Sequence, residues 1–273
     1  GAGGMADSAP APILVACSTY PFQSLPLDQA LVRMDELGFR YADLSISQVA
    51  GAGHMTPAQV REEPVAALEI IESAMDRSHV RIVVLDLETK PFDLTERGQV
   101  EAVCRLARRA GAGVVNVMRA GGKDDAVDLR RLRDFAHVAR DFDLMLTVEP
   151  RGRLTMSPQE AAEAAADAGF RITLDVGRML SGGIPQEAWA PLYPVLGHVH
   201  LYDTKGEDGR RQVPWGTGNV QVGSLMTALR AARYRGFLTA EYLSPTPGDP
   251  APFDPEPELV KLRRAVEAEL AVP

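Results

Sequence analysis

The chain has little of what marks membrane, nucleic-acid-binding or oxidised proteins. Its only two cysteines, Cys17 and Cys104, lack the C-x-x-C spacing of metal or redox pairs, so we expect buried thiols in a reducing, cytoplasmic compartment. No apolar run approaches the roughly 20 residues that cross a bilayer, so no membrane partner is expected. A net charge of -8 without a cluster of Lys and Arg disfavours nucleic acid as the main partner.

The length and hydrophobic content fit one large domain. Of the 273 residues, 45% are hydrophobic, which suffices for a single core, and barrels of roughly 250 residues are common. We expect residues 1–11 to be a disordered tail, with a cloning remnant before Met5, and residues 12–273 to form the domain. The proline-rich segment 244–257 should be a loop, followed by a C-terminal helix over 258–270.

Strand-like and helix-like segments alternate along the chain. A recurring phrase of helix, glycine and strand includes Gly38, Gly111 and Gly169, each at a position where glycine tolerates a positive φ. Such alternation indicates parallel strands, and eight repeats favour a closed (β/α)₈ TIM barrel, an α/β fold, over an open sheet. The eight expected strands lie near residues 13–18, 41–46, 81–87, 113–118, 144–149, 171–175, 197–202 and 237–242.

Four of these runs carry an acid or an imidazole at or near their C-terminal end, namely Glu149, Asp175, His200 and Glu241. All strands of a closed parallel barrel end on one face, where active sites lie, so these side chains can converge despite their separation in sequence. Three carboxylates and an imidazole suit one divalent ion such as Mn²⁺, Mg²⁺, Co²⁺ or Zn²⁺. The sequence therefore predicts a metal centre at this end of the barrel.

Five short motifs occur in order along the second half of the chain: Thr147-Val148-Glu149-Pro150, Leu174-Asp175-Val176-Gly177-Arg178, His198-Val199-His200-Leu201-Tyr202-Asp203, Pro214-Trp215-Gly216-Thr217-Gly218 and Tyr234-Arg235-Gly236-Phe237-Leu238-Thr239-Ala240-Glu241-Tyr242. They resemble motifs of the xylose isomerase-like TIM barrel superfamily, which includes sugar isomerases and epimerases, dehydratases and apurinic endonucleases. By this resemblance, the four residues fall on the family's metal positions, and Glu149 and Glu241 become the catalytic acid and base. His200 is preferred over His198 as the ligand because it directly precedes Leu-x-Asp.

The chain departs from the family where Arg178 follows the strand-six aspartate, because the family often has histidine there. In the DNA-repair branch that histidine helps to bind extra zinc, so Arg178 argues against a trinuclear site. A guanidinium also grips carboxylates and phosphates in a bidentate way. The expected substrate-contacting residues are Arg178, His198, Arg119, Lys205, Arg211 and Trp215.

The resemblance implies a metal-dependent isomerase or epimerase of a small sugar or keto-polyol, acting in carbohydrate metabolism through a metal-stabilised ene-diolate. One alternative is a lyase, a dehydratase of an inosose or of dehydroshikimate, in which the same enolate expels a hydroxyl. Another is a barrel that only binds a partner. The sequence leaves the substrate, the metal, and a monomeric or homo-oligomeric state open.

Overall fold

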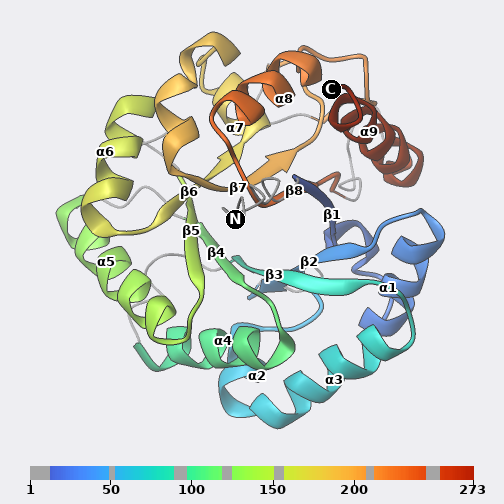
Figure 1. Cartoon of the computed structure of the whole chain (residues 1–273). Coiled ribbons are helices and arrows are strands. Elements are labelled where there is room, and N and C mark those ends of the chain that lie inside the picture. Colours follow the sequence, from blue (N-terminus) through green and yellow to red (C-terminus); the bar gives the residue numbers. More distant parts are fainter. Residues whose placement is uncertain are drawn as a thin grey trace, which may run out of the picture.

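The protein was analysed as a computed structural model that describes residues 13–48, 53–88, 97–118, 125–150, 157–206, 212–243 and 253–273. The expected tail at residues 1–11 and most of the proline-rich loop lie outside these ranges. Eight parallel strands form a closed barrel in sequence order, with helices around it (Figure 1). The strands are β1 (Leu14–Ser18), β2 (Tyr41–Ser47), β3 (Arg81–Glu88), β4 (Val114–Met118), β5 (Met145–Glu149), β6 (Arg171–Asp175), β7 (Leu196–Leu201) and β8 (Phe237–Ala240).

The first and last strands close the barrel. β1 pairs in parallel with β2 and also with β8, in a register that runs from Leu14 opposite Phe237 to Cys17 opposite Ala240. Every neighbouring pair is parallel, so the carboxyl ends of all eight strands face the same end of the barrel. The predicted (β/α)₈ barrel is therefore confirmed.

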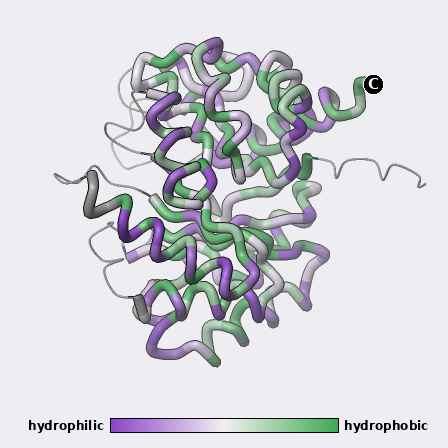
Figure 2. The backbone as a smooth tube through the Cα atoms, turned by 60° about the vertical axis from the view of Figure 1, so that its left-hand side comes forward, coloured by the Kyte–Doolittle hydropathy of each residue, from purple (hydrophilic) through white to green (hydrophobic). Residues whose placement is uncertain are grey.

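The helices pack apolar faces onto the strands. In the first helix the buried residues are Leu27, Ala30, Leu31 and Met34, whose spacing places them on one face. Figure 2 shows hydrophobic colour concentrated along the strands and hydrophilic colour on the surrounding helices. Among the described residues, no helix has the length and apolar character to span a membrane. The helices are α1 (Leu27–Glu36), α2 (Pro57–Glu62), α3 (Pro64–Asp76), α4 (Arg97–Ala110), α5 (Asp125–Asp141), α6 (Pro158–Ala168), α7 (Val176–Ser181), α8 (Val222–Ala231) and α9 (Pro255–Leu270), with short 3₁₀ helices η1 (Tyr20–Phe22), η4 (Gln186–Ala188) and η5 (Ala190–Val195).

Local signals define where helices begin and end. Ser157 caps α6 by accepting a hydrogen bond from the backbone N–H of Glu160, and Gly169 ends it with a φ of 80°. The C-terminal helix begins at Pro255, three residues before the start expected from sequence. Asp254 caps it by accepting a bond from the Glu256 N–H, and proline suits the first helical turn.

Candidate metal centre

The barrel brings the four predicted ligands together. Glu149 and Asp175 are the last residues of β5 and β6, His200 is the penultimate residue of β7, and Glu241 directly follows β8. All four are buried. Residues from four strands thus meet at the carboxyl end of the barrel, as their positions at strand ends predicted.

His200 is at the centre of this group. Its Nδ1 lies 3.0 Å from Oε1 of Glu149 and 2.8 Å from Oε2 of Glu241. Ligand atoms about 2.0–2.2 Å from one ion lie roughly 3 Å from each other, so these separations match a shared coordination sphere. Glu149, Asp175 and His200 each offer a ligand atom within 4.8 Å of the others.

Two further carboxylates lie at the opposite nitrogen of the ring. Nε2 of His200 is 3.5 Å from Oδ2 of Asp43 and 3.4 Å from Oδ2 of Asp86. Asp86 was missed in the sequence. Its signal is a single acid inside the apolar run Val83-Val84-Leu85-Asp86-Leu87, and a charged residue in a buried strand requires a partner.

A hydrogen-bonded belt of polar side chains crosses the barrel interior beneath the centre. Asn116 donates its amide to Oδ1 of Asp86 at 3.0 Å. The side-chain oxygen Oδ1 of Asn116 accepts hydrogen bonds from the hydroxyls of Thr147, at 2.9 Å, and Thr173, at 2.6 Å. Branched apolar residues dominate the interior of most such barrels, so this belt is a local exception that fixes Asp86 in place.

His198 lies on the same strand face as His200, two residues earlier. It is 0% exposed, and its Nε2 lies 3.1 Å from Oδ2 of Asp43 and 2.9 Å from the Thr239 hydroxyl. The Thr239 hydroxyl also donates to Oδ2 of Asp43 at 3.0 Å. These contacts are all inside the barrel, and they do not support the expected contact between His198 and substrate. The histidine next to Glu149 and Glu241 is His200, as the sequence preference expected.

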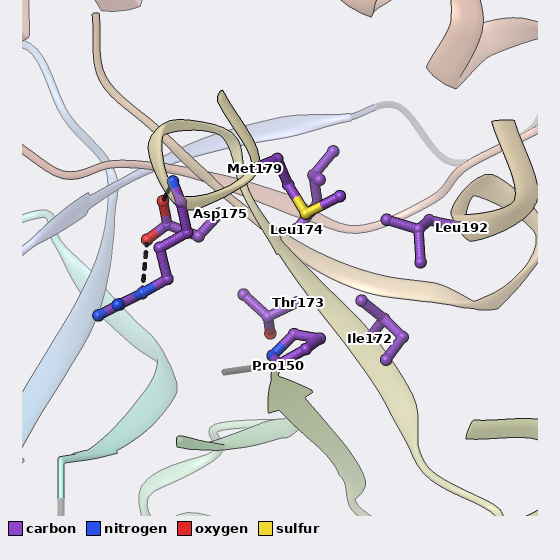
Figure 3. A pocket seen from close by; sticks show the side chains of 8 residues that line it. Pro150, Ile172, Thr173, Leu174, Asp175, Met179 and Leu192 are labelled. Atoms are coloured by element: carbon purple, nitrogen blue, oxygen red, sulfur yellow. Dashed lines mark hydrogen bonds and ion pairs between the residues drawn. The ribbon is translucent and has the colours of Figure 1, made fainter. Parts of the chain in front are cut away.

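Asp175 is held by its strand, by α7 and by Tyr202, which directly follows β7. Its Oδ1 accepts bonds from the Arg178 backbone N–H, at 2.9 Å, which caps α7, and from the Tyr202 hydroxyl, at 3.2 Å. Arg178 Nε lies 3.7 Å from Oδ2 of Asp175 and 3.3 Å from Oε2 of Glu149. Figure 3 shows Asp175 where the strand turns into the helix. The void of about 10 Å³ beside it has room for one water at most, so it is no substrate pocket.

Two other candidates for substrate contact, Lys205 and Trp215, lie in the segment between β7 and α8. Lys205 is exposed, and its carbonyl accepts a bond from the side chain of Asn219. Trp215 packs partly buried against the core, and its backbone N–H donates to Oε2 of Glu258 at 2.7 Å. Arg119 and Arg211 lie outside the described residues.

Asp203 of the His-x-His-Leu-x-Asp phrase organises the loop after β7. Its Oδ2 accepts the N–H groups of Gly216, at 2.8 Å, and Gly218, at 3.0 Å. Its Oδ1 accepts those of Thr204, at 2.9 Å, and Val220, at 3.3 Å. Gly216 has a φ of 90°, and a Cβ on Gly218 would overlap the Asp203 carboxylate. The glycines of the Pro214–Gly218 phrase are therefore explained by this loop, which presents Trp215.

The buried charges shift one another's proton affinities. Burial alone would lower the pKa of His200, but the neighbouring carboxylates, first Glu241 and then Asp43 and Glu149, raise it well above its usual 6.5. Burial alone would raise the pKa of Asp43, but His198 and His200 lower it to about 2. Burial lowers the pKa of His198 despite its bond to Asp43. Asp43 is therefore ionised beside the two histidines.

The donor set fits a divalent cation. Five buried carboxylates, Asp43, Asp86, Glu149, Asp175 and Glu241, lie around His200. Within the part of the chain that the structure describes, the permanent cation that contacts this group is the Arg178 guanidinium. Buried charges that are paired neither with cations nor with metals are strongly unfavourable. Oxygen ligands with one imidazole nitrogen suit Mg²⁺, Mn²⁺, Co²⁺ and Zn²⁺. The residues that would hold such an ion are Glu149, Asp175, His200 and Glu241.

Known structures share this fold. A xylose isomerase-like TIM barrel protein from Mycobacterium smegmatis, in complex with magnesium, has 17% identity and a TM-score of 0.72, over 95% of this chain and 96% of that one. A D-psicose 3-epimerase in the presence of D-fructose has 15% identity and a TM-score of 0.66, over 94% and 97%. The IolI protein with a zinc atom has 14% identity and a TM-score of 0.66, over 94% and 98%.

No curated protein matches the chain in sequence. The structural likenesses, all at low identity, show a shared fold. The family model described as xylose isomerase-like TIM barrel matches residues 31–265, which is most of the chain. Together with the closed eight-stranded barrel, this match shows that the chain belongs to the xylose isomerase-like TIM barrel family.

Proposed function

We propose that this protein is a divalent-metal-dependent isomerase or epimerase of a small sugar or keto-polyol. One observation carries the proposal: Glu149, Asp175, His200 and Glu241 converge from four strands at the carboxyl end of the barrel. The family includes enzymes of this kind, and the structural neighbours include a D-psicose 3-epimerase and proteins with magnesium or zinc. A barrel that only binds a partner would not need so costly a set of buried acids.

The four residues would hold the ion, and two of them would also move protons. When bound, a divalent ion polarises the carbonyl of an α-hydroxy ketone and stabilises the negative charge that develops on its oxygens. Glu149 and Glu241 reach the centre from β5 and β8, and both carboxylates contact the same His200 nitrogen. One would take the proton from the carbon beside the carbonyl, and the other would return a proton to carbon or oxygen.

Arg178 is the proposed contact for an anionic or polyhydroxylated end of the substrate. Its side chain is 14% exposed at the edge of the centre, so the guanidinium is near both solvent and the carboxylates. Guanidinium groups bind oxyanions through paired hydrogen bonds. Lys205 and Trp215 would contact the substrate from the segment between β7 and α8.

Metal content is the first test. Purified wild type should carry about one divalent ion per chain, and Asp175→Ala should carry little, because this variant removes one ligand and leaves the others. Elemental analysis gives both values. Equal metal in both proteins would refute the assignment of Asp175.

The reaction is tested with a panel of ketoses and cyclic polyol ketones in D₂O. An isomerase or epimerase gives a product of unchanged mass except for deuterium on the carbon next to the carbonyl. Glu149→Gln and Glu241→Gln should each lose at least about 10²-fold in kcat while they remain loaded with metal. A product lighter by one water would instead identify a dehydratase, on the same fold and metal centre. Turnover near that of wild type in the glutamine variants would refute their proton-transfer roles.

A further inference from the structure

The two nitrogens of His200 face different sets of carboxylates. Nδ1 lies against Glu149 and Glu241, at 3.0 and 2.8 Å, on the side of the proposed metal centre. Nε2 points to the barrel interior, where it lies 3.5 Å from Asp43 and 3.4 Å from Asp86. The ring is buried, and Nε2 has no hydrogen-bond partner among the described residues. A buried ring nitrogen in this position requires an explanation.

The two interior carboxylates are themselves held by neutral groups. The Thr239 hydroxyl donates to Oδ2 of Asp43, the oxygen that faces both histidines. The Asn116 amide donates to Asp86, and Asn116 is in turn fixed by hydroxyls of β5 and β6. These bonds place one carboxylate from β2 and one from β3 against Nε2, and they restrain both from moving.

We propose that Asp43 and Asp86 are positioning residues for the metal centre: they keep the proton of His200 on Nε2 and so present Nδ1 to the ion. A metal-binding histidine commonly donates its second N–H to a carboxylate, which fixes its tautomer and ring orientation. Here Asp43 and Asp86 share that role, and Asn116 of the hydrogen-bonded belt holds Asp86 in place. The inference rests on the proposed metal centre, but it concerns residues outside the four ligands.

A different arrangement would place a cation in the interior, between Asp43, His198 and His200, which also offer ligand atoms within 4.8 Å of one another. Oδ1 of Asp43 and Nδ1 of His198 have no hydrogen-bond partner in the described ranges, so experiment has to distinguish this arrangement from the proposed one. The two differ in one measurable property. In the proposed arrangement His200 binds the ion through Nδ1 and carries its proton on Nε2. An interior cation would instead bind Nε2, which would then carry no proton.

The test uses Zn²⁺ as the probe, because it is diamagnetic, with the full-length protein labelled with ¹⁵N. Imidazole ¹⁵N–¹H correlation spectra of the loaded wild type should show His200 with a protonated Nε2 and a metal-bound Nδ1. Elemental analysis should give about one Zn²⁺ per chain. A proton on Nδ1, an unprotonated Nε2, or two zinc ions per chain would overturn the proposal.

Variants then test the role of the carboxylates. Asp43→Asn and Asp86→Asn keep side-chain size but remove the charge that faces Nε2, and each should weaken Zn²⁺ affinity by about 10- to 100-fold, the usual effect of losing such a partner. The control is Cys17→Ala, a buried truncation in the neighbouring strand β1 that leaves both carboxylates in place. It should bind Zn²⁺ as wild type does. Circular dichroism checks the fold of each variant.

The outcomes separate this inference from the function proposed above. If wild type binds no Zn²⁺, the metal centre itself is refuted, and this inference with it. If wild type binds one Zn²⁺ but folded Asp43→Asn and Asp86→Asn bind it equally well, only the positioning role is refuted. If the aspartate variants do not fold, the His200 spectrum of wild type still decides between the two nitrogens.

Discussion

Replacement of Asp203 by asparagine should loosen the loop after β7 by a predictable amount. The two carboxylate oxygens of Asp203 accept four backbone N–H groups, two at each oxygen. An asparagine side chain has one oxygen and one NH₂ group. In either orientation its NH₂ faces two N–H donors, so two of the four bonds are lost and cannot be recovered by a flip of the amide.

The magnitude follows from those two bonds. Hydrogen bonds to a charged group contribute about 1.5–3 kcal/mol each, so the loss would be about 3–6 kcal/mol in a dry site. Gly216 is exposed and water can reach its N–H, so we expect roughly 2–4 kcal/mol in the free energy of unfolding. With a urea m-value of about 3 kcal/mol/M, the midpoint should fall by about 1 M.

Urea unfolding followed by tryptophan fluorescence measures this effect. Trp215 lies in the affected loop, and Trp189 is fully buried elsewhere, so native emission should also shift to longer wavelength in Asp203→Asn. Asp254→Asn is the matched control, because Asp254 accepts one bond as a helix cap and asparagine caps equally well. Equal midpoints for Asp203→Asn and the control would refute the reasoning.

Three further predictions concern packing, thiols and charge. A Cβ at Gly177 would overlap the Tyr202 hydroxyl, so Gly177→Ala should lower the free energy of unfolding, measured in urea, by about 1–3 kcal/mol. The control is Gly113→Ala, where a Cβ meets no atom within 4 Å, and its free energy of unfolding should stay within about 0.5 kcal/mol of wild type. Burial raises the pKa of the Cys104 thiol to about 12. Burial also raises the pKa of the Cys17 thiol well above its usual value. At pH 8 both therefore stay protonated, and Ellman's reagent should react only after unfolding; rapid reaction of the native protein would contradict this. Arg178→Met should raise KM more than it lowers kcat once a substrate is known. Because this variant removes a positive charge near two proposed ligands, it should also bind Zn²⁺ more tightly in a titration. An unchanged KM would count against substrate binding by Arg178, and an unchanged Zn²⁺ affinity would count against its electrostatic effect on the centre.

The sequence predicted that the four proposed ligands lie together because each is at or near the end of an apolar run. Glu149 and Asp175 end their strands, so a barrel alone places them on one face. Asp86 was missed because it lies two residues before the end of its strand, where a charged side chain points inward or outward depending on the register. Only the closed barrel shows that it points at His200.

The sequence also could not predict which side chains on distant strands contact each other. Asp43 on β2 meets His198 and His200 on β7 across the barrel interior, and no local pattern encodes that distance. The hydroxyl of Tyr202 reaches Asp175 because Gly177 leaves space for the ring, which depends on how α7 follows β6. Local patterns thus define the elements, and packing defines which polar groups meet.

The pairing of β1 with β8 has a consequence for folding. Strands from opposite ends of the chain must meet before the barrel is complete, and such non-local contacts make folding slow. Glu241 follows β8 directly, so the proposed set of metal ligands is complete only when this last strand has docked. An ion that binds the closed barrel and not the open chain would then favour closure by mass action. Added metal should therefore slow unfolding more than it speeds folding, because it stabilises contacts that form last.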